Sequence, residues 1–391
     1  MRKIVVATVL LAFSVRVEVG LFASQAWAGH LVVSANDGKY PQVDGAYKVA
    51  DPPEPDTLMV IDVSVMPPRV VAEVEVMHGT PGTPNGVALS PDEKLALVSN
   101  TNKVDPKDKT RVVPDDALQV VDLESSPPKI INRLAMGRGP GGVSINRKGD
   151  LALVAHPSDG TVSVLTIEGK TVKQAGTVKI GDERSRVSDV VISPGGRWAL
   201  VSKRGQGTAA ILSIDGTKVE YTKRDVTTGS NPNTLDISSD GKFAVVANQG
   251  QGGGNIDSVT LVDMTAPQIR AVEHVTVGQA PEGISISPNG QWLAVAVRDG
   301  SNLSKKSPFF AEHGKLLLFS LAGGKLTKVA EALTGKNTQG ATFTPDGKHI
   351  IVQNYVEREL AFYSVLGKAL KDTGVRIKVK GYPAAIRIAP Q

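Results

Sequence analysis

The pattern of hydrophobic and polar positions repeats along the chain. Each unit has a short apolar run, four residues typical of a tight turn, and a second apolar run. The clearest example is PNGVALSPDEKLALVSN at residues 84–100. Short apolar runs bounded by turn residues are typical of β-strands. Each unit therefore begins with a predicted β-hairpin.

This hairpin unit occurs in six complete copies and one divided copy. The complete copies lie at residues 84–100, 140–156, 187–203, 232–248, 281–297 and 338–354. The first half of the seventh copy is PAAIRIAPQ at residues 383–391, and its second half is GHLVVSAN at residues 29–36. The copies recur roughly every 45 to 57 residues, which is typical of propeller blades. The divided copy predicts that the two ends of the chain meet.

Two further strands are expected after each hairpin, for example at residues 161–167 and 171–180. Four strands in each of seven units would make an open sheet far beyond the limit of about ten strands. A closed ring avoids this problem. We therefore predict an all-β fold: a seven-bladed β-propeller with four antiparallel strands per blade, whose last blade is closed by strands from both termini.

The first 28 residues have the features of a secretory signal peptide. A basic start is followed by an apolar stretch at residues 4–15, and Ala26-Trp27-Ala28 resembles a cleavage site. A membrane anchor is the alternative, but Arg16 and Glu18 end the apolar run at about twelve residues, whereas a spanning helix needs about 20. We expect a signal peptide at residues 1–28, a propeller domain at 29–391, no membrane span after cleavage, and a periplasmic or secreted protein.

Composition excludes several kinds of chemistry. The chain has no cysteine, which excludes disulfides, thiolate metal sites and a cysteine nucleophile. The formal net charge is +5, and the expected leader removes three basic residues and one acidic residue. With aromatic residues at 4%, this weak charge does not indicate nucleic-acid binding. The six histidines are scattered, so we expect no metal site and no cofactor.

The repeat unit also resembles those of known families. It reads G-x-x-P-x-G, an apolar strand, S-P-D-G-K, and a second apolar strand that ends in Asn. This combination resembles the YVTN-repeat β-propeller proteins and, more distantly, the lactonase-type seven-bladed propellers. The resemblance covers the whole mature chain and implies a propeller. Lactonase-type enzymes carry acidic, basic and cationic residues around the tunnel mouth, although no ordered set of them can be matched here.

In that family's geometry, the loops that leave the second strand lie on one face of the disc, around the central tunnel. Four of these loops are long, at residues 37–56, 101–116, 249–257 and 298–313. We call this side the long-loop face and expect the loops to form two walls beside the tunnel mouth. Loops on a rigid scaffold commonly carry function, and tolerated surface insertion is the alternative.

Two sets of positions on this face are candidates for ligand binding. One set lies at the end of each second strand, where Asn is the commonest residue and His, Lys and Arg depart from it. The other set contains the two acids in the loops that enter the first strand. The candidates are Asn100, His156, Lys203, Asn248, Arg298, Asn354, Asp189 and Glu282. The alternatives are structural: Asn can bond its own backbone at a strand end, and acids can simply be solvated.

The long loop after the fifth copy contains a candidate protein contact. Phe309 and Phe310 follow Lys305 and Lys306 in the stretch SKKSPFF. Exposed aromatic residues are typical anchors of interfaces, although these two are equally suited to covering the disc. In the inner strands, Asp236 and Arg387 replace small or apolar residues of the other copies, and we expect them in ion pairs.

The sequence thus favours an exported binding protein that uses the long-loop face for an unknown protein or a small polar ligand. A lactonase-like hydrolase acting on a small polar substrate at the tunnel mouth is the alternative. No catalytic residue is assigned from the sequence.

Overall fold

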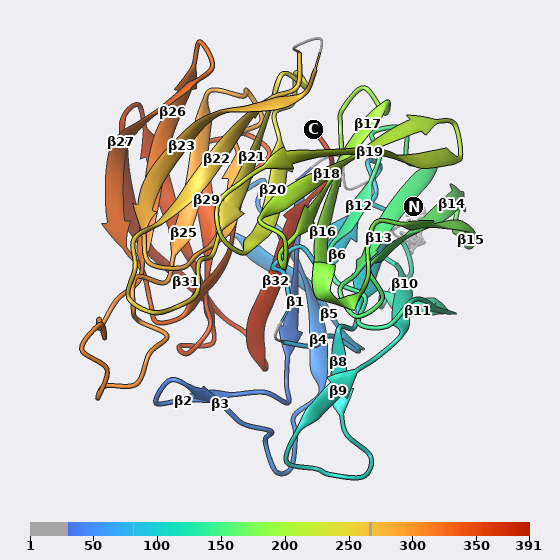
Figure 1. Cartoon of the computed structure of the whole chain (residues 1–391). Helices are drawn as coiled ribbons and strands as arrows, with labels where there is room; N and C mark the ends of the chain where they lie inside the picture. Colours follow the sequence, from blue (N-terminus) through green and yellow to red (C-terminus); the bar gives the residue numbers. More distant parts are fainter. Residues whose placement is uncertain (1–29, 81, 266–267) are drawn as a thin grey trace, which may run out of the picture.

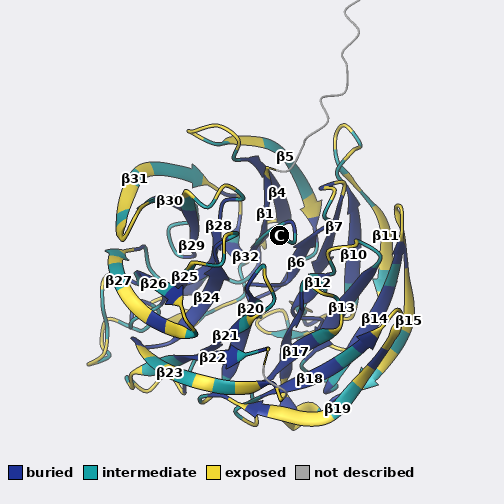
Figure 2. Ribbon diagram, turned by 90° about the horizontal axis from the view of Figure 1, so that it is seen from above, coloured by how far each residue is buried: buried dark blue, intermediate teal, exposed yellow. Residues whose placement is uncertain are grey.

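The computed structural model describes residues 30–80, 82–265 and 268–391. The expected leader, residues 1–28, lies outside this part. The described chain forms seven four-stranded antiparallel sheets (Figure 1), which are arranged radially around a central channel when seen from above (Figure 2). The first strand of each sheet contacts the first strands of its two neighbours, which closes the ring. The predicted fold class is confirmed.

The blades are numbered in the order of the complete sequence copies, and their strands run from the channel outward. Blade 1 has β6 (Val87–Leu89), β7 (Leu95–Ser99), β10 (Ala117–Asp122) and β11 (Lys129–Ala135). Blade 2 has β12 (Val143–Ile145), β13 (Leu151–His156), β14 (Thr161–Glu168) and β15 (Thr171–Lys179). Blade 3 has β16 (Val187–Ile192), β17 (Trp198–Lys203), β18 (Thr208–Asp215) and β19 (Lys218–Thr227). Blade 4 has β20 (Pro232–Ile237), β21 (Phe243–Asn248), β22 (Asp257–Asp263) and β23 (Arg270–Gly278).

The remaining blades follow the same order. Blade 5 has β24 (Pro281–Ile286), β25 (Trp292–Val297), β26 (Lys315–Ala322) and β27 (Lys325–Leu333). Blade 6 has β28 (Thr338–Phe343), β29 (His349–Asn354), β30 (Glu359–Leu366) and β31 (Ala369–Lys378). Blade 7 has β32 (Tyr382–Ile388), β1 (Leu31–Asp37), β4 (Asp56–Asp62) and β5 (Arg69–Val76). A single turn of 3-10 helix, η1 (Glu183–Ser185), precedes blade 3. No helix in the described ranges is long and apolar enough to cross a membrane.

Blade 7 is built from both ends of the chain, as the divided repeat predicted. Strand β32 pairs with β1 in antiparallel register, with Val33 opposite Arg387 and Ala35 opposite Ala385. A second tie comes from the hairpin turn of blade 1, where Glu93 has a positive φ of 57°. Its carboxylate accepts hydrogen bonds from the backbone amides of His30 and Leu31, both at 3.0 Å. The first strand of the chain is therefore fixed on both sides.

The hydrophobic core lies between neighbouring blades. One cluster joins β13 and β14 to β16, β17 and β18, and another joins blade 6 to blade 7. The three inner strands of each blade are mostly buried, whereas the outermost strands are largely exposed at the rim (Figure 2). The inner strands appear in the sequence as continuous apolar runs. Their two apolar faces thus pack against the two neighbouring blades.

Three of the long loops contact one another on the long-loop face. The loop after β1 contains a small hairpin, β2 (Gln42–Val43) and β3 (Ala46–Tyr47), which crosses to the loop after β25. There the Gln42 Nε2 donates to the Asn302 carbonyl at 3.0 Å. The Phe309 ring packs against Gly254 in the loop after β21. These loops meet, so the expected pair of separate walls is not formed.

The fourth long loop, after β7, forms a hairpin of its own, β8 (Asn102–Val104) and β9 (Val112–Pro114). Both small hairpins extend from the same side of the disc, at the lower edge of Figure 1. The tight turns that connect the first and second strand of each blade lie on the opposite side. We call the two ends of the channel the long-loop end and the turn end.

Candidate functional site

A cluster of polar side chains lies at the long-loop end of the channel. Its centre is Glu282, the second residue of β24, whose side chain is only 1% exposed. The Glu282 carboxylate accepts from the Asn233 Nδ2 at 2.9 Å and pairs with the Arg298 Nη2 at 3.0 Å. Arg298 also donates to the Gln339 Oε1 at 3.3 Å. Glu282 therefore joins blades 4, 5 and 6.

A second arginine reaches Glu282 through an amide. The Gln249 side chain donates its Nε2 to the Glu282 Oε2. Its Oε1 accepts from the Arg204 Nη2 at 2.6 Å. Arg204 is held in turn by the Asn231 Oδ1, which accepts from the Arg204 Nε at 2.8 Å. The amide of Gln249 thus lies between a guanidinium and a carboxylate.

The electrostatics of the cluster suit acid–base chemistry. Burial raises the pKa of Glu282, and the charges of Arg298 and Arg204 partly oppose that rise. Burial also lowers the pKa of Arg204 to about 10, so this group stays charged near neutral pH. A carboxyl with a raised pKa can exchange a proton, and the two cations beside it can stabilise negative charge on a bound molecule.

The loop that crosses from blade 7 covers part of this cluster. The Asn337 Nδ2 donates to the Tyr47 hydroxyl at 2.7 Å, and the Gln339 Nε2 donates to the Asn337 Oδ1 at 3.1 Å. Burial raises the pKa of Tyr47, and both Arg298 and Glu282 are close enough to influence it. Four blades and one long loop therefore contribute to a single hydrogen-bonded network.

Of the eight predicted ligand-binding residues, the structure brings Glu282 and Arg298 together in this network. Five others bond instead to their own blade or its loop. The pairs are Asn100 with Asp115 at 2.7 Å, His156 with Ser163 at 2.9 Å, Lys203 with Asp225 at 2.7 Å, Asn248 with Thr260 at 2.9 Å, and Asn354 with Glu359 at 3.1 Å. These side chains fasten the end of the second strand to the next loop or to the outer strands of the same blade, which is a structural role.

Asp189 lies in β16 and bridges neighbouring inner strands. Its carboxylate accepts from the Asn85 Nδ2 at 2.6 Å and from the Leu235 backbone amide at 2.8 Å. Burial raises the pKa of Asp189 to about 6. Asp189 makes no direct pair with Glu282. Its contacts hold blades 1, 3 and 4 together in the channel wall.

The expected protein contact lies on the loop after β25. The Phe309 side chain packs against Gly254, yet Phe309 is still 50% exposed. Lys305 and Lys306 are exposed, and the Lys305 backbone amide donates to the Asp44 Oδ1 at 2.9 Å. Phe310 is partly buried beside them. Phe309 therefore covers part of the neighbouring loop with one side of its ring and leaves the rest of the ring exposed to solvent.

Sequence reasoning missed Arg204 and Gln249, although a signal for them exists. The residue after each second strand is Arg204 in blade 3, Gln249 in blade 4 and Arg298 in blade 5. The candidate set at the end of the second strand used the residue that ends that strand in every blade except blade 5. Side chains of adjacent strand residues point in opposite directions. The residue that ends the second strand therefore points into the blade, and the next residue points to the mouth of the channel.

The described residues contain no group of three or more His, Asp or Glu side chains placed to hold a metal ion. The arginines and Glu282 of the cluster supply charge and proton transfer themselves. The arrangement therefore suits binding and reaction of a small molecule with an exposed carbonyl or carboxylate.

Comparisons with known proteins agree with this fold. Residues 170–263, which include Arg204 and Gln249, match a family model described as "Lactonase, 7-bladed beta-propeller". The chain is similar in fold to lactonase-type propellers. No curated protein sequence matches it.

Solved structures resemble nearly the whole chain. A putative 6-phosphogluconolactonase from Bacteroides fragilis has 19% identity and a TM-score of 0.67, covering 92% of this chain and 98% of that one. The periplasmic gluconolactonase of Pseudomonas aeruginosa has 18% identity and a TM-score of 0.66, covering 92% and 100%. A functionally unknown protein from Desulfotomaculum acetoxidans has 14% identity and a TM-score of 0.67, covering 92% and 99%. At these identities the likeness shows the fold.

Proposed function

We propose that the chain is a hydrolase that opens small polar lactones at the long-loop end of the channel. The observation that carries this proposal is the Gln249 amide held between Arg204 and Glu282. An amide and a lactone share a planar carbonyl, and Arg204 already donates to the carbonyl oxygen in that place. The lactonase family model and the gluconolactonase neighbours support the same chemistry.

The proposed reaction places the lactone carbonyl where the Gln249 amide now lies. Ionised Glu282 takes a proton from a water molecule as that water attacks the carbonyl carbon. Arg204 stabilises the negative oxygen of the tetrahedral intermediate. The bond between the carbonyl carbon and the ring oxygen then breaks, and Glu282 returns the proton to that oxygen. The elements of water thereby end up in the carboxylic acid and the alcohol of a single ring-opened hydroxy acid.

Arg298 has a different part in this proposal. It is paired with Glu282 at 3.0 Å, and its charge opposes the effect of burial on the pKa of that carboxyl. It therefore favours the ionised form of Glu282, which the proposed general base requires. We also propose that the protein acts after export, which the expected leader and the periplasmic neighbour from Pseudomonas aeruginosa support.

The test is hydrolysis of glucono-δ-lactone and 6-phosphogluconolactone by the purified protein, corrected for spontaneous opening. Glu282→Gln should lower kcat about 100-fold or more, because the general base is lost. Arg204→Gln should lower it about 100-fold through loss of the oxyanion donor. Arg184→Gln is the control, since its side chain is 88% exposed and bonds to Asp182 outside the cluster. Wild-type rates equal to the spontaneous rate, or full activity of Glu282→Gln, would contradict the proposal.

Binding of a protein partner is a second candidate, favoured by exposed apolar residues on the long-loop face. Ile256 is 72% exposed and Phe309 is 50% exposed, on loops that contact each other. Exposed aromatic and aliphatic side chains of this kind can anchor a partner. This function would use the outer surface of the loops and is compatible with hydrolysis in the channel beneath them.

A further inference from the structure

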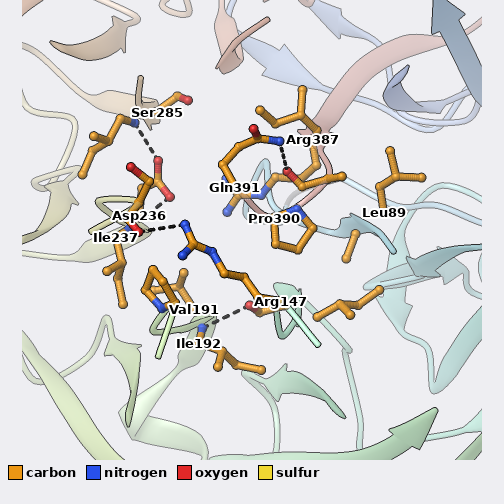
Figure 3. A pocket seen from close by; sticks show the side chains of 18 of the residues that line it. Leu89, Arg147, Val191, Ile192, Asp236, Ile237, Ser285, Arg387, Pro390 and Gln391 are labelled. Atoms are coloured by element: carbon orange, nitrogen blue, oxygen red, sulfur yellow. Dashed lines mark hydrogen bonds between the residues drawn. The ribbon is translucent and has the colours of Figure 1, made fainter. Parts of the chain in front are cut away.

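The turn end of the channel contains a cavity that is separate from the Glu282 cluster. Its volume is about 130 Å³, and residues from all seven inner strands line it (Figure 3). The end of the chain, Pro390 and Gln391, also contributes to the lining. This volume is several times what a single water molecule needs, so the cavity has room for a small organic ligand.

Two arginines supply positive charge to this cavity. Arg147, in the turn of blade 2, crosses the opening toward the side that carries Asp236 (Figure 3), and its Nη2 donates to the Ser239 carbonyl of blade 4 at 2.7 Å. Arg387, in β32, has no hydrogen bond or ion pair with any described residue. A guanidinium has five N–H donors, so most of the donors in this cavity are available to a ligand.

The nearby carboxylates do not occupy these donors. The Asp236 carboxylate accepts from the backbone amides of Ile237 at 3.0 Å and Ile286 at 2.6 Å. The expected ion pair of Asp236 with Arg387 is therefore absent from the described structure. Asp236 is in blade 4 and Arg387 is in blade 7, so two blades separate them on the shorter way round. The backbone of the next inner strand is closer and satisfies the acid instead.

The rest of the cavity wall is mainly aliphatic. Each of five inner strands contributes an isoleucine from its last position. The main aliphatic lining residues are Leu89, Ile145, Ile192, Ile237, Ile286 and Ile388. Two hydroxyls, those of Ser144 and Ser285, accept from backbone amides of the next blade at 3.1 and 3.3 Å. A ligand would therefore meet guanidinium donors from two sides of the channel, and a wall of aliphatic side chains interspersed with serine and threonine hydroxyls.

We propose that the turn end of the channel binds a small aliphatic monocarboxylate. The two oxygens of a carboxylate match the fork of a guanidinium, and the N–H donors of Arg387 carry no hydrogen bond to a described residue, although its charge also interacts with the carboxyls of Asp189 and Asp236. The aliphatic wall then packs against a chain of three or four carbons. A phosphate fits less well, because its oxygens need donors on every side and its second charge would face Asp236. This proposal is independent of the proposed hydrolase activity.

The experiment is titration calorimetry of the purified protein with butyrate and isovalerate at neutral pH and low salt. Arg387→Ser and Arg147→Gln should each weaken binding at least tenfold. Serine occupies the position equivalent to Arg387 in blades 2 and 5, as Ser144 and Ser285, so the first variant should fold. Lys148→Gln is the matched control, because Lys148 is exposed beside Arg147 and pairs with Asp150 instead.

A neutral probe tests whether the charge of the ligand is needed, and an inorganic probe tests whether its aliphatic chain is needed. Butanamide has the shape of butyrate without its charge and should bind at least tenfold more weakly. Inorganic phosphate should also bind at least tenfold more weakly. The proposal is overturned if butyrate and isovalerate do not bind, if butanamide or phosphate binds as well as butyrate, or if Arg387→Ser keeps full affinity while its circular dichroism spectrum matches the wild type.

Discussion

At the scale of single residues, one repeat position has a structural role and the next can carry function. The last residue of each second strand bonds within its own blade, whether it is Asn248, Lys203 or His156. The following residue, as in Arg204 and Arg298, faces the channel network. His156 fits the structural role because it is fully buried and burial lowers its pKa to about 4.

The buried histidine predicts a pH dependence of stability. In the folded state His156 stays neutral down to about pH 4, whereas in the unfolded chain it gains a proton near its ordinary pKa of 6.5. Acid therefore favours the unfolded state, and the free energy of unfolding should fall as the pH drops from about 6.5 to 4. The full effect is on the order of 3 kcal/mol. We expect His156→Asn to lose less stability than the wild type over this range.

Urea unfolding at pH 7, 5.5 and 4 measures this difference. Asparagine is the residue at the equivalent position in four other blades, including Asn100 and Asn354, so the variant should fold. The difference between the two proteins isolates His156 from other groups, such as Asp189, whose raised pKa acts in the opposite direction. Parallel pH profiles of the two proteins would show that His156 does not carry the effect.

At the scale of elements, the loop after β1 is held in place by aromatic stacking and by another long loop. Tyr40 stacks on Tyr47 at 5.4 Å, and Tyr47 meets Tyr355 edge to face at 5.7 Å. Tyr355 stacks in turn on Tyr382 at 5.1 Å. On its other side, Asp44 accepts from the Ser304 hydroxyl at 3.1 Å. The loop is thus tied to both blade 6 and blade 5.

Shortening the loop at residues 301–312 to a four-residue turn should free the loop after β1 without unfolding the propeller. The cost of loop length to stability is small, and each blade keeps its four strands. Trypsin should then cleave after the exposed Lys48 at least fivefold faster than in the wild type. Peptide mapping of a brief digestion measures this rate. Asp44→Asn weakens only part of the contact between the two loops and should increase the cleavage rate less. Equal cleavage rates of the wild type, the shortened-loop variant and Asp44→Asn would show that the aromatic contacts alone hold the loop after β1.

At the scale of the whole molecule, the ring depends on the pairing of β32 with β1. Strand β32 also contacts the inner strands of blades 6 and 1. Removing it would leave the edge of β1 and two neighbouring blades uncovered, and uncovered strand edges promote aggregation. The contact between the two ends of the chain therefore stabilises every blade through closure.

Deletion of residues 382–391 should lower the melting temperature by more than 10 °C or cause aggregation, because it removes β32 and its apolar contacts. Scanning calorimetry and size-exclusion chromatography measure these outcomes. Deletion of Pro390 and Gln391 alone is the matched control, since it keeps all of β32 and should leave the melting temperature within a few degrees. A melting curve that is unchanged after the longer deletion would contradict the role of closure.

The sequence by itself determined the number of blades, the strand pattern and the closure by both termini, whereas the shared side of the long loops was implied by the resemblance to known propellers. The blade number, strand pattern and closure follow from repeated local patterns, because alternating apolar runs and turn residues act within a few positions. It also identified Glu282 and Arg298, which stand out from their repeat positions within one blade.

Only the tertiary structure decided which residues share a site. Arg204 and Gln249 reach Glu282 from neighbouring blades, and their side-chain directions depend on a single position in the pleat. Arg387 and Asp236 both line the turn-end cavity, but one backbone amide of the acid's own strand and one of the adjacent blade hydrogen-bond to the acid, and no hydrogen bond joins it to Arg387. Such contacts join residues far apart in the chain through the closed ring, and no local pattern in the sequence specifies them.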